Sequence, residues 1–398
     1  MGMKENNWRY NEVSSYAVLQ DCEQHSRGEK GKGLASYKYW LSCLTFLAGK
    51  KKICLEAMFG GAREIYHAEE NDISNLPFLT DREKELLKEA KKQSLGKLLQ
   101  ELDDIENAGI RLVTWQEEEY PGKLKEIYNP PYGLFCRGKL PDERQKAVGV
   151  VGARICSSYG KIIAEKIGQG LAKAGVAVIS GMASGVDGAA QSGALLSGGY
   201  SCGVLGCGID VCYPAMNRKL YDDLIQAGGL LSEYPPHAKP HAMYFPQRNR
   251  IISGLSDCIL VVEAKKRSGS LITVDFALEQ GKDIYAVPGR ICDALSYGTN
   301  CLIQQGAGVF LNMEDFLREM HIFAESGENS SLKQKNHLEN LERLVYSCLD
   351  LSPRSIEELL KETGMPLGAL MENLETLQEK GCVSEIYRNY YIRSDVSV

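Results

Sequence analysis

Apolar and polar positions follow two alternating patterns through the middle of the chain. Short apolar, β-branched runs at Cys258 to Glu263 and at Asp283 to Val287 predict strands that are buried on both faces. Between them, apolar residues recur at helical spacing from Leu271 to Gln280. Strand, helix and strand in this order predict a βαβ unit, whose two strands lie parallel in one sheet.

The same alternation extends upstream. A buried strand begins at Ala147 and ends at Gly152, and a helix follows from Ser157 to Ala174. Three further strands, in the stretches VAVIS, YSCGVL and GLLSE, each follow a helical or turn segment. At least six strands that alternate with helices predict an α/β fold with a doubly wound, mostly parallel sheet.

The pattern changes on both sides of this region and predicts five parts. Residues 1–34 have no sustained period and are expected to form a poorly ordered extension, whereas 35–115 are helical, with breaks at Gly60-Gly61 and Leu76-Pro77. The helical part has the size of a sterile-alpha-motif or helix-hairpin-helix domain. The α/β domain is expected over 116–320, a polar linker over 321–337, and three helices with a β-ribbon over 338–398, which is the plan of a winged helix.

Small polar residues gather where the predicted strands end. Ligands of α/β folds bind at the carboxyl ends of the strands, and a helix N-terminus there offers free N–H groups to an anion. Several successive turns of this kind suit several successive phosphates better than one nucleotide. The turn residues that we expect to bind are Gly152, Arg154, Ser157, Ser180, Gly181, Ser184, Gly185, Ser268, Gly269 and Ser270.

Further basic and aromatic residues flank these turns. A protein that binds single-stranded nucleic acid needs a positive groove along the backbone and aromatic faces on which bases stack. Tyr213 and Tyr244 are further candidate aromatics, although both also fit as packing residues. Capping serines and solvated surface arginines remain the plain alternative for the whole set. The flanking candidates are Phe245, Arg248, Asn249, Arg250 and Lys265.

The net charge of −6 is unevenly distributed along the chain. Residues 146–320 hold 16 basic and 15 acidic residues, whereas 338–398 hold 6 and 11. An anion-binding face must therefore be a local patch in the middle of the chain. The helix expected from Leu367 to Lys380 carries three glutamates, which a duplex would repel, so we expect the carboxyl-terminal part to contact protein.

Several classes of protein are disfavoured by what the sequence lacks. Neither the dinucleotide pattern G-x-G-x-x-G nor the P-loop pattern occurs, and no apolar run is long enough to span a membrane. Thirteen cysteines without a C-x-x-C pair indicate free thiols in a reducing compartment, which predicts a cytoplasmic protein. No His or Cys stands at ligand spacing around Asp187, Asp210 or Glu263, so we expect no metal and no cofactor. Asp187 is expected to hydrogen-bond a turn, and Glu263 to pair with an arginine.

Long ordered motifs carry a resemblance to a known family. VGVVGARICSSYG, VISGMASGVDGAA, GVLGCGIDVCYPAMNRKLY, FPQRNRIISGLSDCILVVEAKKRSGSLIT and ALEQGKDIYAVPG lie within 120–320. Together they resemble the DNA-processing protein A family (DprA, also called Smf). The resemblance implies a Rossmann-like core that binds single-stranded DNA, dimerises and hands the strand to the RecA recombinase during natural transformation. It also implies that Arg154 and Arg248 contact phosphates and that Phe245 lies beside the strand as an apolar or stacking contact.

Two positions depart from that family pattern, and one segment is implicated in self-association. Ala153 stands where the family usually has threonine, and Gln191 where it usually has histidine; an amide cannot shuttle a proton, which favours a binding site over an active site. The resemblance places the dimer contact in an apolar segment near the end of the sheet, and core packing is the alternative there. The expected contact residues are Leu302, Ile303, Val309 and Phe310.

An enzyme is the rival interpretation. The stretch SGSLITVDFALEQGK distantly resembles the glycine-rich motif of the nucleotide-monophosphate phosphoribohydrolases, which share this type of core. In that case Glu279 or Glu263 would be catalytic and a nucleotide would occupy the pocket. The run Pro-Gly-Gly-x-Gly-Thr of those enzymes is missing, and this speaks against the interpretation.

Overall fold

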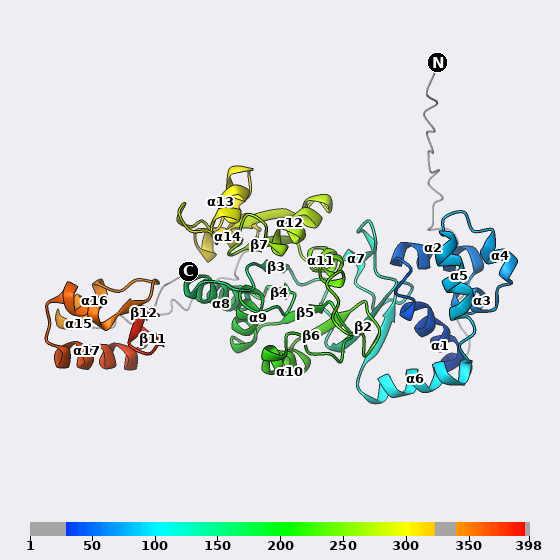
Figure 1. Cartoon of the computed structure of the whole chain (residues 1–398), viewed down its shortest axis with the longest axis horizontal. Coiled ribbons are helices and arrows are strands. Elements are labelled where there is room, and N and C mark those ends of the chain that lie inside the picture. The colour runs from blue at the N-terminus through cyan, green and yellow to red at the C-terminus, as the bar shows by residue number, and fades with distance from the viewer. Residues whose placement is uncertain (1–28, 323–339, 395–398) are drawn as a thin grey trace, which may run out of the picture.

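The computed structural model describes residues 29–322 and 340–394. It is elongated, with a group of helices at one end, a large sheet in the middle and a small carboxyl-terminal group at the other end (Figure 1). Residues 1–28 of the expected extension and 323–337 of the expected linker lie outside the described residues. Helix α1 already begins at Glu29, inside the segment that the sequence pattern assigned to the extension.

A nine-stranded sheet in the order β1-β2-β6-β5-β4-β3-β7-β8-β9 forms the centre. From β6 to β9 all neighbouring strands are parallel, whereas β2 runs antiparallel to both β1 and β6. This confirms the predicted α/β class with a large, mostly parallel sheet. The strands are β1 (Arg111–Thr114), β2 (Gly133–Gly138), β3 (Ala147–Val151), β4 (Ala177–Ser180), β5 (Ser201–Leu205), β6 (Gly229–Ser232), β7 (Cys258–Val261), β8 (Asp283–Ala286) and β9 (Gly308–Val309).

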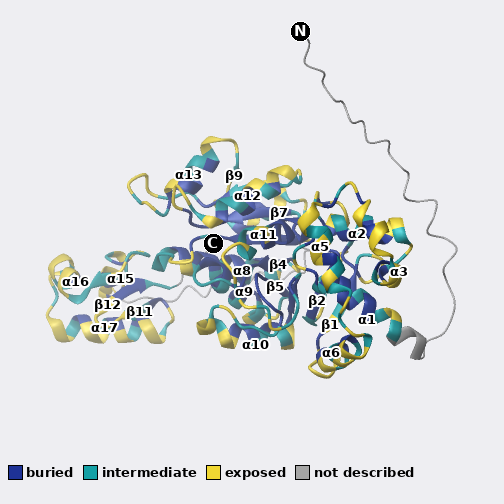
Figure 2. Cartoon of the chain, turned by 45° about the vertical axis from the view of Figure 1, so that its right-hand side comes forward, coloured by how far each residue is buried: buried dark blue, intermediate teal, exposed yellow. Residues whose placement is uncertain are grey.

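Helices cover both faces of the sheet, so the central strands are buried on both sides (Figure 2). Alternate residues of a strand point to opposite faces, which is why Val150 packs with one layer of helices and Val151 with the other. The layer that contacts Val150 contains α8 (Ser158–Lys173), α9 (Val186–Leu196), α10 (Arg218–Ala227) and α14 (Met313–Glu319). The opposite layer contains α7 (Gly122–Lys125), α11 (Tyr244–Leu255), α12 (Gly269–Glu279) and α13 (Tyr297–Gln304).

Helix α11 was not predicted from the sequence. Its pattern is hard to recognise because Arg248 and Arg250 are buried, so charged residues stand where a helix usually has apolar ones. A proline in the first turn obscures the period further, although proline is well tolerated there. This helix places Phe245, Arg248 and Asn249 beside the ends of the strands.

The amino-terminal helices share one core with the near end of the sheet. Trp40 and Leu98 from these helices belong to the same cluster as Tyr132, Phe135 and residues of α10, so the helical group is packed onto the sheet. The helices are α1 (Glu29–Cys43), α2 (Gly49–Phe59), α3 (Ala62–His67), α4 (Glu70–Ser74), α5 (Asp81–Ala90) and α6 (Leu95–Asn107).

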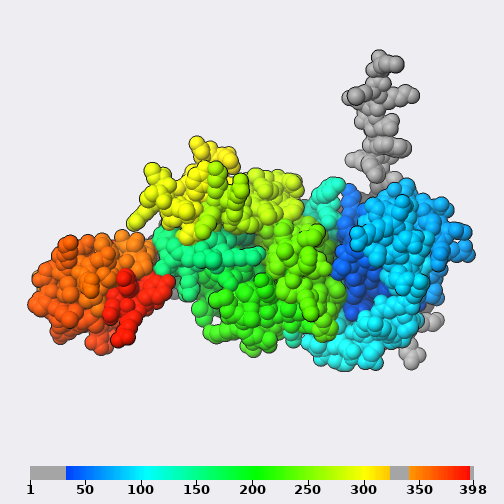
Figure 3. All heavy atoms as spheres, in the orientation of Figure 1, coloured from blue at the N-terminus to red at the C-terminus, as the bar shows by residue number. Residues whose placement is uncertain are grey.

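The carboxyl-terminal group has its own small core around Val345, Leu359 and Leu374. It lies beside the central part in Figure 3, and a hollow between the two is lined by Pro288 and Pro353. Within the two described stretches, no helix has the length and apolar character that a membrane crossing requires. The elements are α15 (Asn340–Ser347), β10 (Arg354–Ser355), α16 (Ile356–Thr363), α17 (Leu367–Glu379), β11 (Val383–Tyr387) and β12 (Tyr390–Arg393).

Candidate functional site

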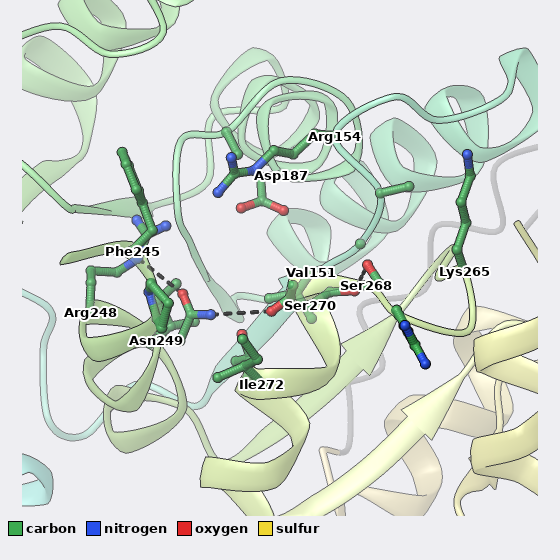
Figure 4. A pocket seen from close by; sticks show the side chains of 18 of the residues that line it. Val151, Arg154, Asp187, Phe245, Arg248, Asn249, Lys265, Ser268, Ser270 and Ile272 are labelled. Atoms are coloured by element: carbon green, nitrogen blue, oxygen red, sulfur yellow. Dashed lines mark hydrogen bonds between the residues drawn. The ribbon is translucent and has the colours of Figure 1, made fainter. Parts of the chain in front are cut away.

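A hollow of about 430 Å³ opens at the carboxyl ends of β3 and β7 (Figure 4). The chain leaves β3 toward β4 on one side and leaves β7 toward β8 on the other, so this is the switch point where open α/β sheets bind ligands. Four segments line it: the turn after β3, the turn between β7 and α12, the first turns of α11, and the turn after β4 with the start of α9, which contribute Ala183 and Asp187. We call this hollow the switch-point pocket.

The amino terminus of α12 forms one wall of the pocket. Ser268 stands at the N-cap position, and its hydroxyl lies 2.8 Å from the hydroxyl of Ser270. The side chain of Asn249 donates to the carbonyl of Gly269 over 3.4 Å, which ties this turn to α11. The first N–H groups of a helix have no partner within the helix, so this wall offers donors and a positive dipole end to an anion.

Three exposed cations, Arg154, Lys265 and Arg267, stand at the rim of the pocket. Arg154 follows β3, and its guanidinium carbon lies 5.3 Å from the centre of the Phe245 ring. Lys265 follows β7 and stands on the far side of Ser268 in Figure 4. Arg154 and Lys265 are exposed, and neither has a carboxylate within ion-pair distance in the part of the chain that the structure describes, so both side chains can turn toward an incoming anion.

Arg248 is buried beneath the pocket and binds the protein itself. Its Nη1 donates to the carbonyl of Gly181 over 2.9 Å and also to the carbonyl of Val204, and its Nε donates to Asn249. Burial lowers the pKa of Arg248 to about 10, which still leaves it protonated at neutral pH. These hydrogen bonds occupy Nε and Nη1, so less of the Arg248 guanidinium is left for the direct phosphate contact predicted from the sequence. Arg248 adds positive charge to the floor of the switch-point pocket and holds α11 against the strands.

Asp187 balances this buried arginine. Its Oδ2 accepts from the N–H of Gly181 over 3.1 Å, which confirms the turn hydrogen bond expected from the sequence. Burial raises the pKa of Asp187, and the charge of Arg248 opposes that shift. A Cβ at position 181 would lie 2.5 Å from the Arg248 guanidinium, so any residue larger than glycine would displace that side chain.

Several of the predicted binding residues point away from the pocket. Ser180 is buried and donates to the carbonyl of Val150 over 2.6 Å, and Ser184 and Gly185 line a different hollow between α9 and α10. Arg250 is buried on the inner side of α11. These residues shape the neighbouring turns instead of lining the pocket.

Ser157 and Glu263 form a pair of their own behind the β3 turn. Ser157 caps α8, and both its N–H and its hydroxyl donate to the Glu263 carboxylate, over 2.9 and 2.5 Å. The expectation that Glu263 pairs with an arginine is therefore wrong. Arg250 pairs instead with Glu233, at 2.7 Å.

Of the two departures from the family pattern, Gln191 lies away from the pocket and Ala153 lines it. The buried amide of Gln191 accepts from the N–H of Met182 over 3.0 Å and donates to Ser201 over 3.3 Å. This bond supports the left-handed backbone of Met182, which has φ +53°. Ala153 is buried but lines the switch-point pocket, so the missing threonine hydroxyl is a donor lost from the pocket wall.

The apolar part of the pocket gave no signal in the sequence. Ile155 and Ile272 line the hollow beside the polar turns, and Ile155 is almost fully exposed. In the sequence, a single isoleucine after a strand cannot be distinguished from a residue of the strand itself. Only the structure shows that Ile155 lines the pocket. Among the described residues, no group of three or more His, Cys, Asp and Glu side chains is arranged to hold a metal ion.

The four residues expected at a dimer contact differ in how far the structure buries them. Leu302 and Phe310 are buried in the cores on opposite faces of the sheet, so core packing, the alternative, explains both. Ile303 is half-buried, and Val309 on the last strand is 40% exposed. Val309 is therefore the member of this set that is open to a partner.

The fold and the pocket together define a Rossmann-like α/β protein with a site at the switch point of its sheet. The sequence model of the family described as DNA recombination-mediator protein A matches residues 111–321. Because this match covers more than half of the chain, the chain belongs to that family.

Relatives and a solved structure agree. The chain is 39% identical to DNA processing protein DprA of Bacillus subtilis over 235 residues, which are 59% of this chain and 79% of the relative. It is 35% identical to protein Smf of Escherichia coli, with 72% of this chain and 78% of the relative covered. The X-ray structure of DNA processing protein A from Streptococcus pneumoniae superposes with a TM-score of 0.62 at 35% identity, covering 72% of this chain and 97% of that chain.

Proposed function

We propose that this chain binds single-stranded DNA in the switch-point pocket, protects it and passes it to the RecA recombinase during DNA uptake and natural transformation. The observation that carries the proposal is the position of Arg154 over Phe245, next to the open amino terminus of α12. A cation and an aromatic face stand together there, beside free N–H groups. The family membership supports DNA as the partner, since its relatives are described as DNA processing proteins.

A single strand fits this arrangement better than a duplex. Bases can stack on Phe245 only when they are unpaired, whereas a duplex hides its aromatic faces. The pocket is a hollow of limited size rather than a long flat surface, so it suits a flexible backbone that bends into it. Exposed Arg154 and Lys265 would then hold successive phosphates against the helix terminus.

We expect preferential binding to a single strand, with a marked salt dependence. If about four phosphates are neutralised, log K should fall with log salt at a slope of roughly −0.7 × 4, or about −3. Fluorescence anisotropy with a labelled oligothymidine, and with a duplex of equal length, measures both at a series of salt concentrations. A flat salt response, or tighter binding of the duplex, contradicts the proposal.

The enzymatic alternative finds less support in the structure. Glu279 is the last residue of α12, and the pocket lies at the other end of that helix, roughly 15 Å away at 1.5 Å per residue. Glu263 does not line the pocket, and both its oxygens accept from Ser157. Neither carboxylate proposed for a phosphoribohydrolase is thus placed to act on a nucleotide there.

We also propose that the protein forms a homodimer through the edge of the sheet at β9. An edge strand has unpaired backbone groups that favour pairing with another chain, and Val309 and Leu311 are exposed there. A charged residue at the contact would have to be buried without a partner, which is costly.

The variant Val309→Glu is therefore expected to be a folded monomer at micromolar concentration. Light scattering measures the mass of this variant and of Leu86→Glu, a control at a partly exposed leucine on α5. The control should keep the mass of the wild type. A wild type that is already a monomer, or a dimeric Val309→Glu, would contradict the proposed interface.

The flanking parts extend the proposal. The amino-terminal helices are proposed to be a sterile-alpha-motif or helix-hairpin-helix type domain, and the carboxyl-terminal group a winged helix. In a winged helix, α17 would be the helix that enters a major groove, yet it carries Glu372, Glu375 and Glu379. Because phosphates repel these carboxylates, we propose that this group contacts protein and leaves DNA to the switch-point pocket.

A further inference from the structure

We infer that Tyr213 forms a second base-stacking surface beside Phe245 and takes the base next to the one on Phe245. The inference rests on the proposed binding of a single strand and specifies what the pocket recognises: two neighbouring unpaired bases. It assigns a ligand contact to the loop between β5 and α10, which does not line the switch-point pocket itself.

The two rings are close and one of them is open. Their centres lie 5.4 Å apart with an angle of 37° between the ring planes, within the range of packed aromatic pairs. Tyr213 is nevertheless 44% exposed. Arg154 lies over the same Phe245 ring at 5.3 Å. A guanidinium and two aromatic rings therefore form one cluster with Phe245 at its centre, and Tyr213 extends this cluster beyond the pocket.

The loop that carries Tyr213 is held in place from both ends. At its end, the side chain of Asn217 donates to the carbonyls of Met182 and Ala183, over 2.9 and 3.2 Å. At its start, Ser232 donates to the carbonyl of Cys207 over 2.6 Å. A stacking surface that is already fixed loses little conformational entropy when a base settles on it.

Gly206 allows the loop to approach Phe245. A Cβ at this position would lie 2.8 Å from the Phe245 ring, so any other residue would push the ring or the loop away. The close contact between the loop and the first turn of α11 thus depends on this glycine. The backbone at Gly206 therefore keeps the rings of Tyr213 and Phe245 next to each other.

The other aromatic pair near α11 differs in a way that supports this assignment. Tyr234 is buried and stacks on Tyr244, with the ring centres 3.9 Å apart and an angle of 22° between the ring planes. The stacked faces of these two rings are therefore not available to a base. In the described part of the chain, the Tyr213 hydroxyl has no hydrogen-bond partner within the protein. Neither burial nor a hydrogen bond therefore explains why an aromatic side chain stands at Tyr213.

The test uses the full chain and three substitutions of Tyr213. Tyr213→Ala should weaken binding of an oligothymidine about tenfold, since stacking of one base contributes roughly 1–3 kcal/mol. Tyr213→Phe keeps the aromatic face and should bind like the wild type. Tyr213→Leu keeps an apolar contact with Phe245 but has no aromatic face, so it should bind as weakly as the alanine variant. The slope of log K against log salt should stay unchanged in all three, because no phosphate contact is lost.

Abasic oligonucleotides identify the base that is involved. Single abasic sites placed along the strand should reduce wild-type binding at two neighbouring positions. At one of the two, Tyr213→Ala should show no further loss, which is the coupling that a direct contact produces. An equal loss in both proteins at every position would overturn the inference.

The outcomes separate the inference from the function on which it rests. If the wild type binds the strand and Tyr213→Leu binds equally well, Tyr213 is no stacking surface, while the proposed function stands. If the wild type itself does not bind single strands, the proposed function fails. Should the alanine variant unfold, as thermal melting reports, the leucine variant and the abasic series still decide the question.

Discussion

Replacing Arg154 and Lys265 together with alanine is expected to weaken single-strand binding about a hundredfold. Both cations are exposed at the rim of the pocket, and among the described residues neither has a carboxylate within ion-pair distance. Their loss should therefore remove the proposed phosphate contacts and, within the protein, the contact of Arg154 with the Phe245 ring. Two charge-assisted hydrogen bonds of roughly 1.5 kcal/mol each give a loss of about 3 kcal/mol. The slope of log K against log salt should become shallower by about 0.7 × 2, or roughly 1.4.

A control with the same change of net charge separates the site from the overall field. Arg144 and Lys173 are exposed near the amino ends of the strands, Arg144 shortly before β3 and Lys173 as the last residue of α8. The double variant Arg144→Ala/Lys173→Ala should keep most of the affinity. If both double variants lose affinity equally, the rim cations act only through net charge and the pocket is wrongly placed. Melting temperatures should be unchanged in both.

The strands could be predicted from the sequence because each is a short apolar run next to a turn signal. Cys258–Val261 and Ala147–Val151 are buried on both faces. A strand buried in this way consists almost entirely of apolar residues, and such a run is easy to recognise in a sequence. Helix α11 could not be predicted in this way. Its inner face carries Arg248 and Arg250, which are stabilised by carbonyls and a carboxylate from distant parts of the chain.

The site was predicted where chemistry is local and missed where it depends on contacts far apart in the sequence. Ser268 and Ser270 lie at a helix terminus that follows directly from the strand before it, and the structure places both in the pocket. Arg250 follows Arg248 by only two positions in α11, yet that shift turns its side chain to Glu233. A guanidinium in the sequence does not reveal which partner it has.

Helix α11 thus connects three parts of the molecule. Its first turns carry the pocket residues Phe245 and Asn249, whereas Arg250 donates over 2.8 Å to the carbonyl of Asn129, in the segment that leads into β2. The buried ammonium of Lys52, from α2, lies in the same region; burial lowers its pKa to about 8, and the charge of Glu233 partly opposes that shift. One carboxylate therefore balances cations from the helical group and from α11.

Removing that carboxylate should have a large effect on stability. The side chains of Arg250 and Glu233 are only 8% and 17% exposed and meet at 2.7 Å. Breaking a buried pair leaves an uncompensated charge, so Glu233→Ala should lower the free energy of unfolding by about 3 kcal/mol or more. At roughly 2–4 °C per kcal/mol, the melting temperature should fall by about 6–12 °C. Differential scanning calorimetry at neutral pH measures this change.

Two comparison variants show whether the unpaired charge is the cause. Glu314→Ala breaks an exposed ion pair between Glu314, whose side chain is 85% exposed, and Arg318, whose side chain is 62% exposed. This variant should change the free energy of unfolding by less than about 1 kcal/mol. Glu233→Leu combined with Arg250→Met removes both charges and should regain most of the loss, because apolar residues of similar volume replace buried ion pairs well. If Glu233→Ala melts like the wild type, the pair does not hold α11. If the double replacement melts as low as Glu233→Ala, the loss comes from packing rather than from the unpaired guanidinium.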